Sequence, residues 1–239
     1  MCCVKKPGQD SHDKTREVCI RVETTAGHPD THAAAVTLGG DLTIPANAVG
    51  IVLFAHGSGS SRHSPRNQFV ARAIRERGVA TLLFDLLTEE EEAQDDLTGR
   101  LRFDIGLLAG RLVAATKWIA RQQETQKLGI GYFGASTGGA AALVAAAEIG
   151  PAIDAVVSRG GRPDLASEAL ESVQSPTLLI VGERDETVLE LNRSAFDRLP
   201  CEKELKVITR ATHLFEEPGA LEQVARLAAD WFRRRLRPR

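Results

Sequence analysis

The chain has few of the residues that mark metal-binding or disulfide-rich proteins. Its 239 residues include only four cysteines, one methionine and one tyrosine. The cysteines form no C-x-x-C pair and no metal-ligand spacing, so neither a zinc-type site nor a disulfide framework is expected. Two of them, Cys2 and Cys3, open the chain, where acylation is one interpretation and a reduced, unmodified tail is the simpler one. This cysteine usage favours a reducing, cytoplasmic compartment.

Long apolar runs and a strong net charge are also missing. No run approaches the ~20 apolar residues that a transmembrane helix requires. The polar segment 5–16 lacks the apolar core of a secretory signal. With a formal net charge of −2, the chain has no overall attraction to nucleic acid or to an anionic membrane. The arginines in segment 233–239 are interpreted as complementing the dipole of a closing helix, so we expect neither a nucleic-acid nor a membrane partner.

What the composition does contain suits one α/β domain. Hydrophobic residues make up 43% of the chain and charged residues 26%, as in ordinary globular proteins. We expect a flexible tail over residues 1–16 and a single domain over 17–239, because no linker interrupts the latter. From Gly50 onward, apolar runs such as 51–55 alternate with helical patterns. This alternation predicts a mostly parallel sheet with helices on both faces.

Several local predictions depend on weaker patterns. Segments 18–23 and 34–38 are predicted as strands that precede the parallel part, with a turn at 39–41. The acidic run 89–96 is predicted to be a solvated loop. Apolar residues at alternating steps of four and three predict a long amphipathic helix over 101–119.

One segment in the middle of the chain carries a nucleophile motif. Gly134-Ala135-Ser136-Thr137-Gly138 fits the pattern G-x-S-x-G, which occurs nowhere else in the sequence. The pattern places Ser136 on a sharp turn between an apolar strand and an alanine-rich helix, where free backbone N–H groups face a developing oxyanion. Glycine two residues to either side would relieve collisions with the strand and the helix. The alternative interpretation is an ordinary tight turn whose serine caps the helix.

An overlapping segment formally fits the dinucleotide-binding fingerprint. Residues 129–134 read G-x-G-x-x-G, but these glycines lie inside the apolar run instead of following it. No acidic residue ends a next strand at the spacing that a ribose contact requires. We therefore reject a dinucleotide site and expect no cofactor.

Two polar residues, Asp185 and His213, follow later apolar strands. Because the carboxyl ends of parallel strands meet at one edge of a sheet, both are expected near Ser136. The chain order Ser, Asp, His is also that of a hydrolase triad. We predict Ser136 as nucleophile, His213 as general base and Asp185 as the group that orients the imidazole. Taken singly, Asp185 could instead cap the helix that follows it, and His213 could be an ordinary loop residue.

The loop after the first parallel strand, residues 56–61, is rich in glycine and serine. We expect it to supply the second oxyanion donor, the backbone N–H of Ser58, beside that of Thr137. His56 is expected to shape this loop and not to act as a base.

Arginines on the same edge suggest a preference for acidic substrates. Arg62, His63 and Arg159 are candidates for binding an acidic substrate group, because guanidinium groups hold carboxylates bidentately. The alternative is that these arginines form structural ion pairs with Glu183, Glu186 or the acidic run.

The chain resembles the α/β-hydrolase superfamily, and within it the small, capless dienelactone-hydrolase-like esterases. The resemblance rests on residues 56–60, 134–138, 182–185 and 212–213, and it spans about 38–235. It implies a mainly parallel sheet of about eight strands, no substantial lid and ester hydrolysis through an acyl-enzyme. Dienelactone hydrolase itself uses a cysteine nucleophile, whereas this chain has serine at that position, so a general carboxylesterase is the expectation.

The resulting hypothesis is a serine hydrolase that cleaves small carboxylic esters or thioesters without a metal or cofactor. One alternative is a peptidase or acyl-peptide hydrolase on the same fold. Another is a hydrolase-shaped binding protein that does not turn over its ligand. The sequence does not indicate an oligomeric state.

Overall fold

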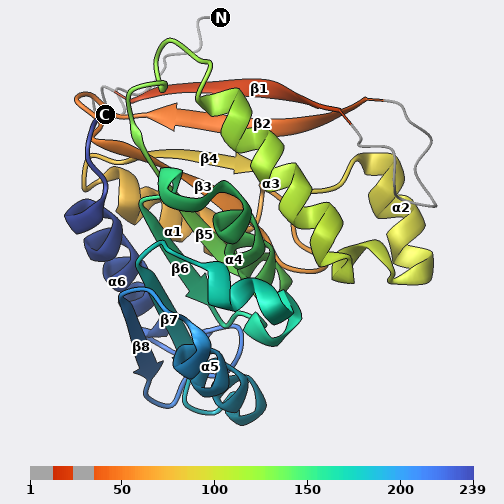
Figure 1. Cartoon of the computed structure of the whole chain (residues 1–239), viewed down its shortest axis with the longest axis vertical. Coiled ribbons are helices and arrows are strands. Elements are labelled where there is room, and N and C mark those ends of the chain that lie inside the picture. The colour runs from red at the N-terminus through yellow and green to blue at the C-terminus, as the bar shows by residue number, and fades with distance from the viewer. Residues whose placement is uncertain (1–12, 24–34) are drawn as a thin grey trace, which may run out of the picture.

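The computed structural model describes residues 13–23 and 35–239. The described part contains one eight-stranded sheet in the order β1-β2-β4-β3-β5-β6-β7-β8 (Figure 1). The strands are β1 (Lys14–Val22), β2 (Val36–Ile44), β3 (Gly50–Ala55), β4 (Ala80–Phe84), β5 (Gly129–Ala135), β6 (Ala155–Arg159), β7 (Thr177–Gly182) and β8 (Lys203–Ile208). β1, β2 and β4 pair antiparallel, and all other neighbours are parallel. The predicted fold class is confirmed.

Helices cover both faces of the sheet. α1 and α6 lie on one face, while α3, α4 and α5 lie on the other (Figure 1). The helices are α1 (Pro65–Arg75), α2 (Glu89–Thr98), α3 (Ile105–Ile119), α4 (Thr137–Ile149), α5 (Glu186–Arg198) and α6 (Ala220–Arg235), with the short 3-10 helices η1 (Leu101–Phe103), η2 (Gly150–Ala152) and η3 (Pro163–Ser172). Because crossovers between parallel strands place helices on both sides, the central strands are shielded from water.

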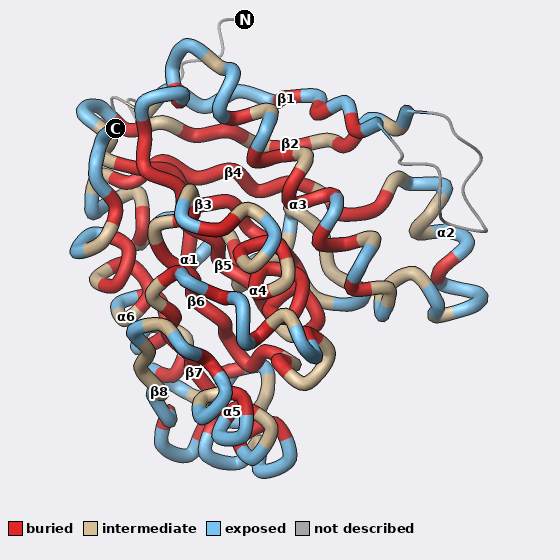
Figure 2. The backbone as a smooth tube through the Cα atoms, viewed as in Figure 1, coloured by how far each residue is buried: buried red, intermediate tan, exposed pale blue. Residues whose placement is uncertain are grey.

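The core lies along the middle of the sheet. Every residue of β3, β4, β5, β6 and β7 is buried, in keeping with their continuous apolar sequences (Figure 2). The edge strand β8 is only partly buried. The strands that carry the site are therefore rigid, and loops at their carboxyl ends can be held in fixed positions.

The first two strands differ from their predicted extents. β1 begins at Lys14, so residues 14–16 of the expected tail belong to the sheet. Cys2 and Cys3, with most of that tail, lie outside the described residues. The predicted turn at 39–41 is wrong, because β2 runs straight through it. Its glycines serve close packing: a Cβ at Gly40 would lie 3.0 Å from Cβ of Phe84, and one at Gly39 would press on the guanidinium of Arg62.

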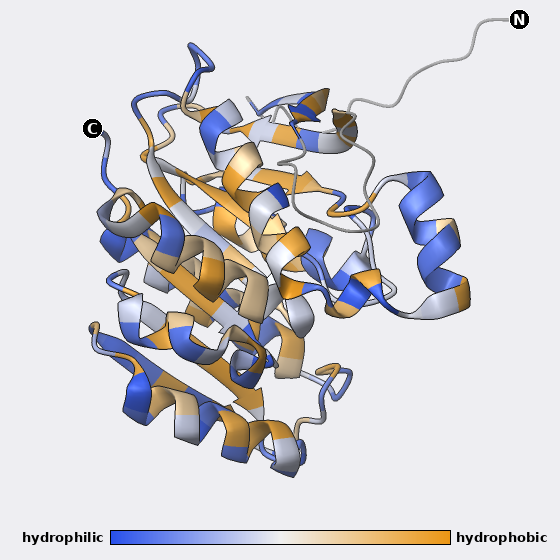
Figure 3. Cartoon of the chain, turned by 45° about the vertical axis from the view of Figure 1, so that its right-hand side comes forward, coloured by the Kyte–Doolittle hydropathy of each residue, from blue (hydrophilic) through white to orange (hydrophobic). Residues whose placement is uncertain are grey.

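The acidic run is a helix and not the predicted loop. Thr88 and Glu91 form a reciprocal capping box at the start of α2, and Gly99 ends the helix in the left-handed conformation. The four glutamates of the first turn are favoured there by the helix dipole. α2 stands out as a strongly hydrophilic helix at one side of the molecule (Figure 3). The predicted helix over 101–119 is divided at Asp104, whose carboxylate caps α3.

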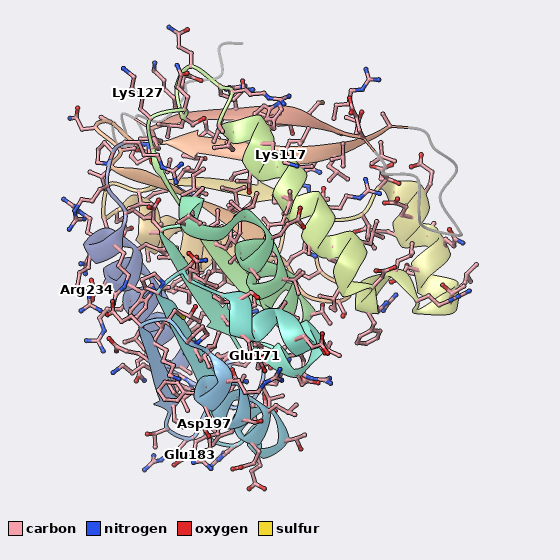
Figure 4. All side chains as sticks on the ribbon, in the orientation of Figure 1. Lys117, Lys127, Glu171, Glu183, Asp197 and Arg234 are labelled. Atoms are coloured by element: carbon pink, nitrogen blue, oxygen red, sulfur yellow. The ribbon has the colours of Figure 1, made fainter. Side chains whose placement is uncertain are left out.

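Charged side chains surround this core on the outside, as the labelled residues of Figure 4 illustrate. Two of the C-terminal arginines are tied to the fold: Arg235 pairs with Glu202 and stacks on Trp231, and Arg239 pairs with Asp154. Among the described residues, no helix combines the length and the apolar character that crossing a bilayer would require.

Candidate active site

Ser136 lies on the sharp turn between β5 and α4. Its φ and ψ of 51° and −120° are unusual for a residue with a side chain. The turn is held from both sides, because the Ser136 N–H donates to Arg159 O at 3.2 Å while its carbonyl accepts from the N–H groups of Gly139 and Arg162. A strained conformation persists only where its surroundings enforce it, and such residues cluster at functional sites.

The glycines of the motif have the predicted steric role. A side chain at Gly134 would overlap the backbone of Gly138, and a side chain at Gly138 would overlap the carbonyl oxygen of Ala55. The expectation that these two glycines relieve collisions with the flanking strand and helix is confirmed. The interpretation of Ser136 as a helix cap is not supported, since its side chain makes no capping hydrogen bond.

Asp185 and His213 come together from loops after β7 and β8. The His213 Nδ1 lies 2.6 Å from Asp185 Oδ2. The carboxylate is 14% exposed and the imidazole 38%, so the pair is sheltered on the aspartate side and open on the histidine side. Asp185 occupies the N-cap position of α5, yet its side chain makes no capping bond. Asp185 therefore contacts His213 and does not cap α5.

His213 packs beside the segment that follows β6. Gly160 has a φ of 51°, and a Cβ placed on it would lie in van der Waals contact with the ring, 3.5 Å from Nδ1 and Cε1. Gly160 follows Arg159, the residue that accepts the Ser136 N–H. In the described part of the chain Ser136 Oγ makes no hydrogen bond, including to His213. In free enzymes this contact is commonly long and shortens when substrate binds.

The loop after β3 approaches Ser136 from the opposite side. A Cβ on Gly57 would lie 3.1 Å from the Cβ of Ser136. The loop closes as a turn with Ser60 N–H donating to Gly57 O at 3.2 Å, and Gly59 has a φ of 63°. The hydroxyls of Ser58 and Thr137 lie 3.2 Å apart. Among the described backbone hydrogen bonds, none uses the N–H of Ser58 or of Thr137, which leaves both predicted donors available.

His56 anchors this loop to the one after β4. The ring is 6% exposed; its Nε2 accepts from the Leu86 N–H at 3.0 Å and its Nδ1–H donates to Gly57 O at 3.1 Å. Burial lowers the pKa of His56 below its ordinary value. The two contacts occupy both ring nitrogens in the neutral form, so His56 shapes the loop and has no free nitrogen for a base.

This burial predicts a pH dependence of stability. Below about pH 6.5 the unfolded chain protonates His56 while the folded chain resists protonation, so the free energy of unfolding should fall as pH drops from 7 toward 5. His56→Gln, which does not titrate, should flatten this slope. Urea unfolding at several pH values would check the prediction, and an identical slope in wild type and variant would contradict it.

A cavity of about 250 Å³ opens beside the oxyanion loop. It is lined by residues 56–61, Leu86, Leu87, Glu92, Asp95, Asp96, Arg102, Leu108 and Thr137. Burial, followed by the nearby Asp85 and Asp96, raises the pKa of the Glu92 carboxyl. Asp95 is fully engaged, because it accepts from the backbone of Leu101 and from Arg102. This side of the site is small and carries carboxylates.

The arginines predicted as substrate ligands fall into different environments. Arg62 pairs with Asp85 through its side chain and its backbone N–H, and it lies 3.8 Å from Asp41. These contacts favour the structural alternative for Arg62, with Asp85 and Asp41 as its partners and not the acidic residues expected. His63 is exposed, and the only hydrogen bond shown for it joins its backbone N–H to Ser61 Oγ.

Arg159 is the exception among these cations. It is 7% exposed, and its Nε and Nη1 have no hydrogen-bond partner among the residues that the structure describes. The ring of Phe215 lies 5.9 Å from its Cζ. Burial, and secondarily the charge of Arg66, lowers the pKa of Arg159 to about 10. No carboxylate of the described residues pairs with it, so the expected structural ion pair is absent at this position.

Two residues beside the site, Asp85 and Gly160, were not predicted from the sequence. Asp85 directly follows β4 at the same edge as Ser136 and holds Arg62; its position after an apolar strand was the available signal. Gly160 adopts a positive φ in contact with His213, but a glycine after a strand has many other meanings. Among the described residues, no cluster of histidine, cysteine or acidic side chains is arranged to hold a metal ion.

Comparison with known proteins agrees with this geometry. The family described as "Alpha/beta hydrolase domain" matches residues 48–226, three quarters of the chain. The chain belongs to the α/β-hydrolase family. It is 57% identical to the crystal structure of a dienelactone hydrolase from Anabaena variabilis, with a TM-score of 0.85 over 93% of this chain and 99% of that one. The esterase Est1E from Butyrivibrio proteoclasticus shares 15% identity with a TM-score of 0.70, over 90% of this chain and 97% of that one, and so shares the fold.

The curated relatives of this hydrolase are longer proteins. Two Mycobacterium tuberculosis proteins, named as candidate phosphoribosyl transferases, are 59% identical to it over 200 residues. The match covers 84% of this chain but 44% of each relative, so the chain spans less than half of their length.

Proposed function

We propose that this α/β hydrolase is a serine esterase that cleaves small carboxylic esters or thioesters through an acyl-enzyme. The observation that carries the proposal is the 2.6 Å contact between His213 and Asp185, at the same sheet edge as the strained Ser136. If Asp185 only capped α5 and His213 were an ordinary loop residue, the two side chains would not be expected to contact each other. The free N–H groups of Ser58 and Thr137 complete the set of required parts.

The mechanism follows from the chemistry of these groups. His213 Nε2 takes the proton of Ser136 as its Oγ attacks the ester carbonyl, and the oxyanion accepts from the N–H groups of Ser58 and Thr137. Asp185 holds Nδ1–H and stabilises the imidazolium without taking the proton. The imidazolium then protonates the departing alcohol or thiol. A water, deprotonated by His213, attacks the acyl-enzyme and releases the acid.

The test is labelling of the purified chain by a fluorophosphonate, followed by a panel of esters, thioesters and peptides. The esterase proposal expects labelling and faster turnover of small esters or thioesters than of peptides, because the cavity measures about 250 Å³. Preferred cleavage of peptides would favour the peptidase alternative. Absence of both labelling and turnover would favour a binding protein that uses the pocket without chemistry.

The name of the mycobacterial relatives is not carried to this chain. More than half of each relative lies outside the match, so the name can describe a part that this chain does not contain. The strained serine and the His–Asp pair support acyl transfer. We therefore propose no phosphoribosyl transfer here.

Arg159 supports a finer proposal, that the substrate bears an acidic group. A buried, unpaired guanidinium is costly to keep, since burying a charge without a partner opposes folding. The backbone carbonyl of Arg159 accepts a hydrogen bond from the Ser136 N–H, so Arg159 lies next to the proposed nucleophile. Glu92 lines the cavity beside the oxyanion loop and would repel an anion there. We therefore expect the acidic group of the substrate to lie toward Arg159.

Replacing Arg159 with methionine is expected to separate binding from stability. KM should rise about tenfold or more for an ester with a free carboxylate, because a lost bond to a charged group costs roughly 1.5–3 kcal/mol. KM for the neutral methyl analogue should change little. The melting temperature should stay the same or rise, since an apolar side chain of similar size removes a buried unpaired charge.

Arg162→Gln is the matched control, because Arg162 lies three residues away and is already paired with Asp164 at 2.8 and 2.7 Å. It should leave both KM values unchanged. Equal changes for the charged and neutral esters in Arg159→Met would show that Arg159 belongs to the scaffold.

A further inference from the structure

In the described part of the chain, β1 forms a long outer edge of the sheet. Its nine residues pair with β2 one to one from Lys14 to Val22 without a bulge, and no other described strand pairs with it. It contains no proline. Proteins usually shorten, bend or cover such edges, because the free N–H and C=O groups can pair with a second chain.

The side chains of β1 divide cleanly between the two faces of the sheet. Val18, Ile20 and Val22 are buried in the core beside α3. Glu17, Cys19 and Arg21 alternate with them and are exposed. Within the described part of the chain, neither the Glu17 nor the Arg21 side chain has a hydrogen bond or an ion pair, and Glu17 interacts with Arg62 only through longer-range electrostatic attraction. The strand therefore offers one carboxylate and one guanidinium, four residues apart on the same exposed face.

We propose that two copies of this chain pair antiparallel through β1, around a two-fold axis at Cys19. In this register Glu17 of each copy lies opposite Arg21 of the other, which forms two cross-strand ion pairs. Val18 lies opposite Ile20 of the other copy on the buried face. Opposite charges and branched apolar residues directly across from each other are the pairs that stabilise antiparallel strands.

The charge pattern favours this register over those centred on the neighbouring residues from Arg16 to Ile20. Outward-facing backbone groups alternate along a strand, so a symmetric antiparallel pair must centre on a residue that lies opposite itself. Centring on Arg16 or Glu17 opposes two like charges at the axis. Centring on Val18 sets Glu17 against Cys19, and centring on Ile20 sets Glu17 against Glu23. Of these registers, the one at Cys19 joins opposite charges without opposing like charges.

Surface shape near β1 fits the same arrangement. Arg16 pairs with Glu124 at 3.2 Å, which ties the loop between α3 and β5 to the first half of β1; Figure 1 shows this loop rising past the strand. A groove of about 700 Å³ runs along α3 from the C-terminal end of β1, lined by Arg21, Val22, Glu23, Glu148 and the α3 side, including Lys117, Trp118 and Arg121. Because the two-fold sets Arg16 opposite Val22 of the second copy, each Glu124 comes near the end of this groove that Arg21 and Val22 line on the other copy.

The proposed interface leaves the active site open. β1 is at one end of the sheet, whereas β7 and β8, which precede Asp185 and His213, are at the other. The pairing therefore does not depend on the proposed esterase function. Changes on β1 should leave turnover per chain unaffected, and at protein concentrations well below the dimer dissociation constant the variants should melt at the wild-type temperature, which distinguishes loss of pairing from loss of structure.

Charge reversal tests the pairing. By sedimentation equilibrium over a concentration series, the wild type should show a monomer–dimer equilibrium. Glu17→Arg and Arg21→Glu should each raise the dimer dissociation constant about tenfold or more, because two attractive cross-strand pairs become repulsive. The double variant should return toward the wild-type value. Lys206→Glu on the opposite edge strand, β8, is the control and should have no effect.

A wild type that remains monomeric throughout the series would overturn the proposal. So would a dimer that is indifferent to both single reversals, or one that Lys206→Glu disrupts. In that last case β8 would be the pairing edge.

Disulfide cross-linking tests the register. In a background with Cys2, Cys3 and Cys201 replaced by serine, mild oxidation should link two copies through Cys19, because directly opposite residues have Cα atoms within disulfide range. The control moves the cysteine by Cys19→Ser with Thr15→Cys. The two Thr15 positions would be eight residues apart across the pair, ~26 Å, and should not cross-link. Equal cross-linking at both positions, or none at Cys19, would refute the register.

Discussion

Ser136→Ala is expected to lower ester turnover by about 10⁴-fold or more and to abolish fluorophosphonate labelling. The variant loses the only atom proposed to form the acyl bond. The fold should survive with an unchanged melting temperature, because Ser136 Oγ makes no hydrogen bond in the described part of the chain. Alanine also keeps the Cβ that already fits the strained turn. Active-site labelling, steady-state kinetics and thermal unfolding measure the three quantities.

Ser58→Ala is the matched control for this prediction. It removes a nearby hydroxyl, 3.2 Å from that of Thr137, but keeps the backbone N–H proposed to bind the oxyanion. Labelling and most of the turnover should therefore remain. Labelling that persists in Ser136→Ala but disappears in Ser58→Ala would exclude Ser136 as the nucleophile.

Removal of Asp185 and His213 is expected to be strongly non-additive. His213→Ala should cost about 10⁴-fold in kcat, since the serine loses its base, and Asp185→Ala should cost a comparable amount, since the imidazole loses its orientation. The double variant should be little slower than His213→Ala alone, because Asp185 acts only through His213. A double-mutant cycle on kcat measures this coupling.

Glu183→Gln provides the control carboxylate. It lies two residues before Asp185, but its side chain accepts from the Arg210 N–H and does not contact His213. It should leave kcat within about twofold. Losses that multiply in the Asp185 and His213 double variant would mean that the two residues act independently and that the 2.6 Å contact has no catalytic role.

The elbow illustrates how much local sequence can predict. The collisions that require Gly134 and Gly138 arise between residues close in the chain and in the strands beside them, so the motif alone indicated the turn, the strain and the position of Ser136. Buried parallel strands were equally clear, because strands covered on both faces must be apolar throughout.

Two other local sequence patterns were present, but another pattern at the same residues led to the wrong prediction. Thr88 and Glu91 have the spacing of a capping box, yet the density of negative charge suggested a solvated loop. The pair Gly39-Gly40 reads equally well as a turn or as a site of close packing. Only the positions of Arg62 and Phe84, from distant parts of the chain, distinguish the two.

By itself, the sequence determined the mostly parallel sheet, the strained serine turn and the chain order of the three proposed catalytic residues, because each depends on neighbours in the chain. Tertiary structure alone decided the choice of partner. In the fold, Asp185 contacts His213 and does not cap the helix it precedes, and Arg62 pairs with Asp85. Arg159 is buried with no carboxylate partner in the described segments. A charged side chain pairs with whatever the fold brings within reach, and residues far apart in the sequence determine that.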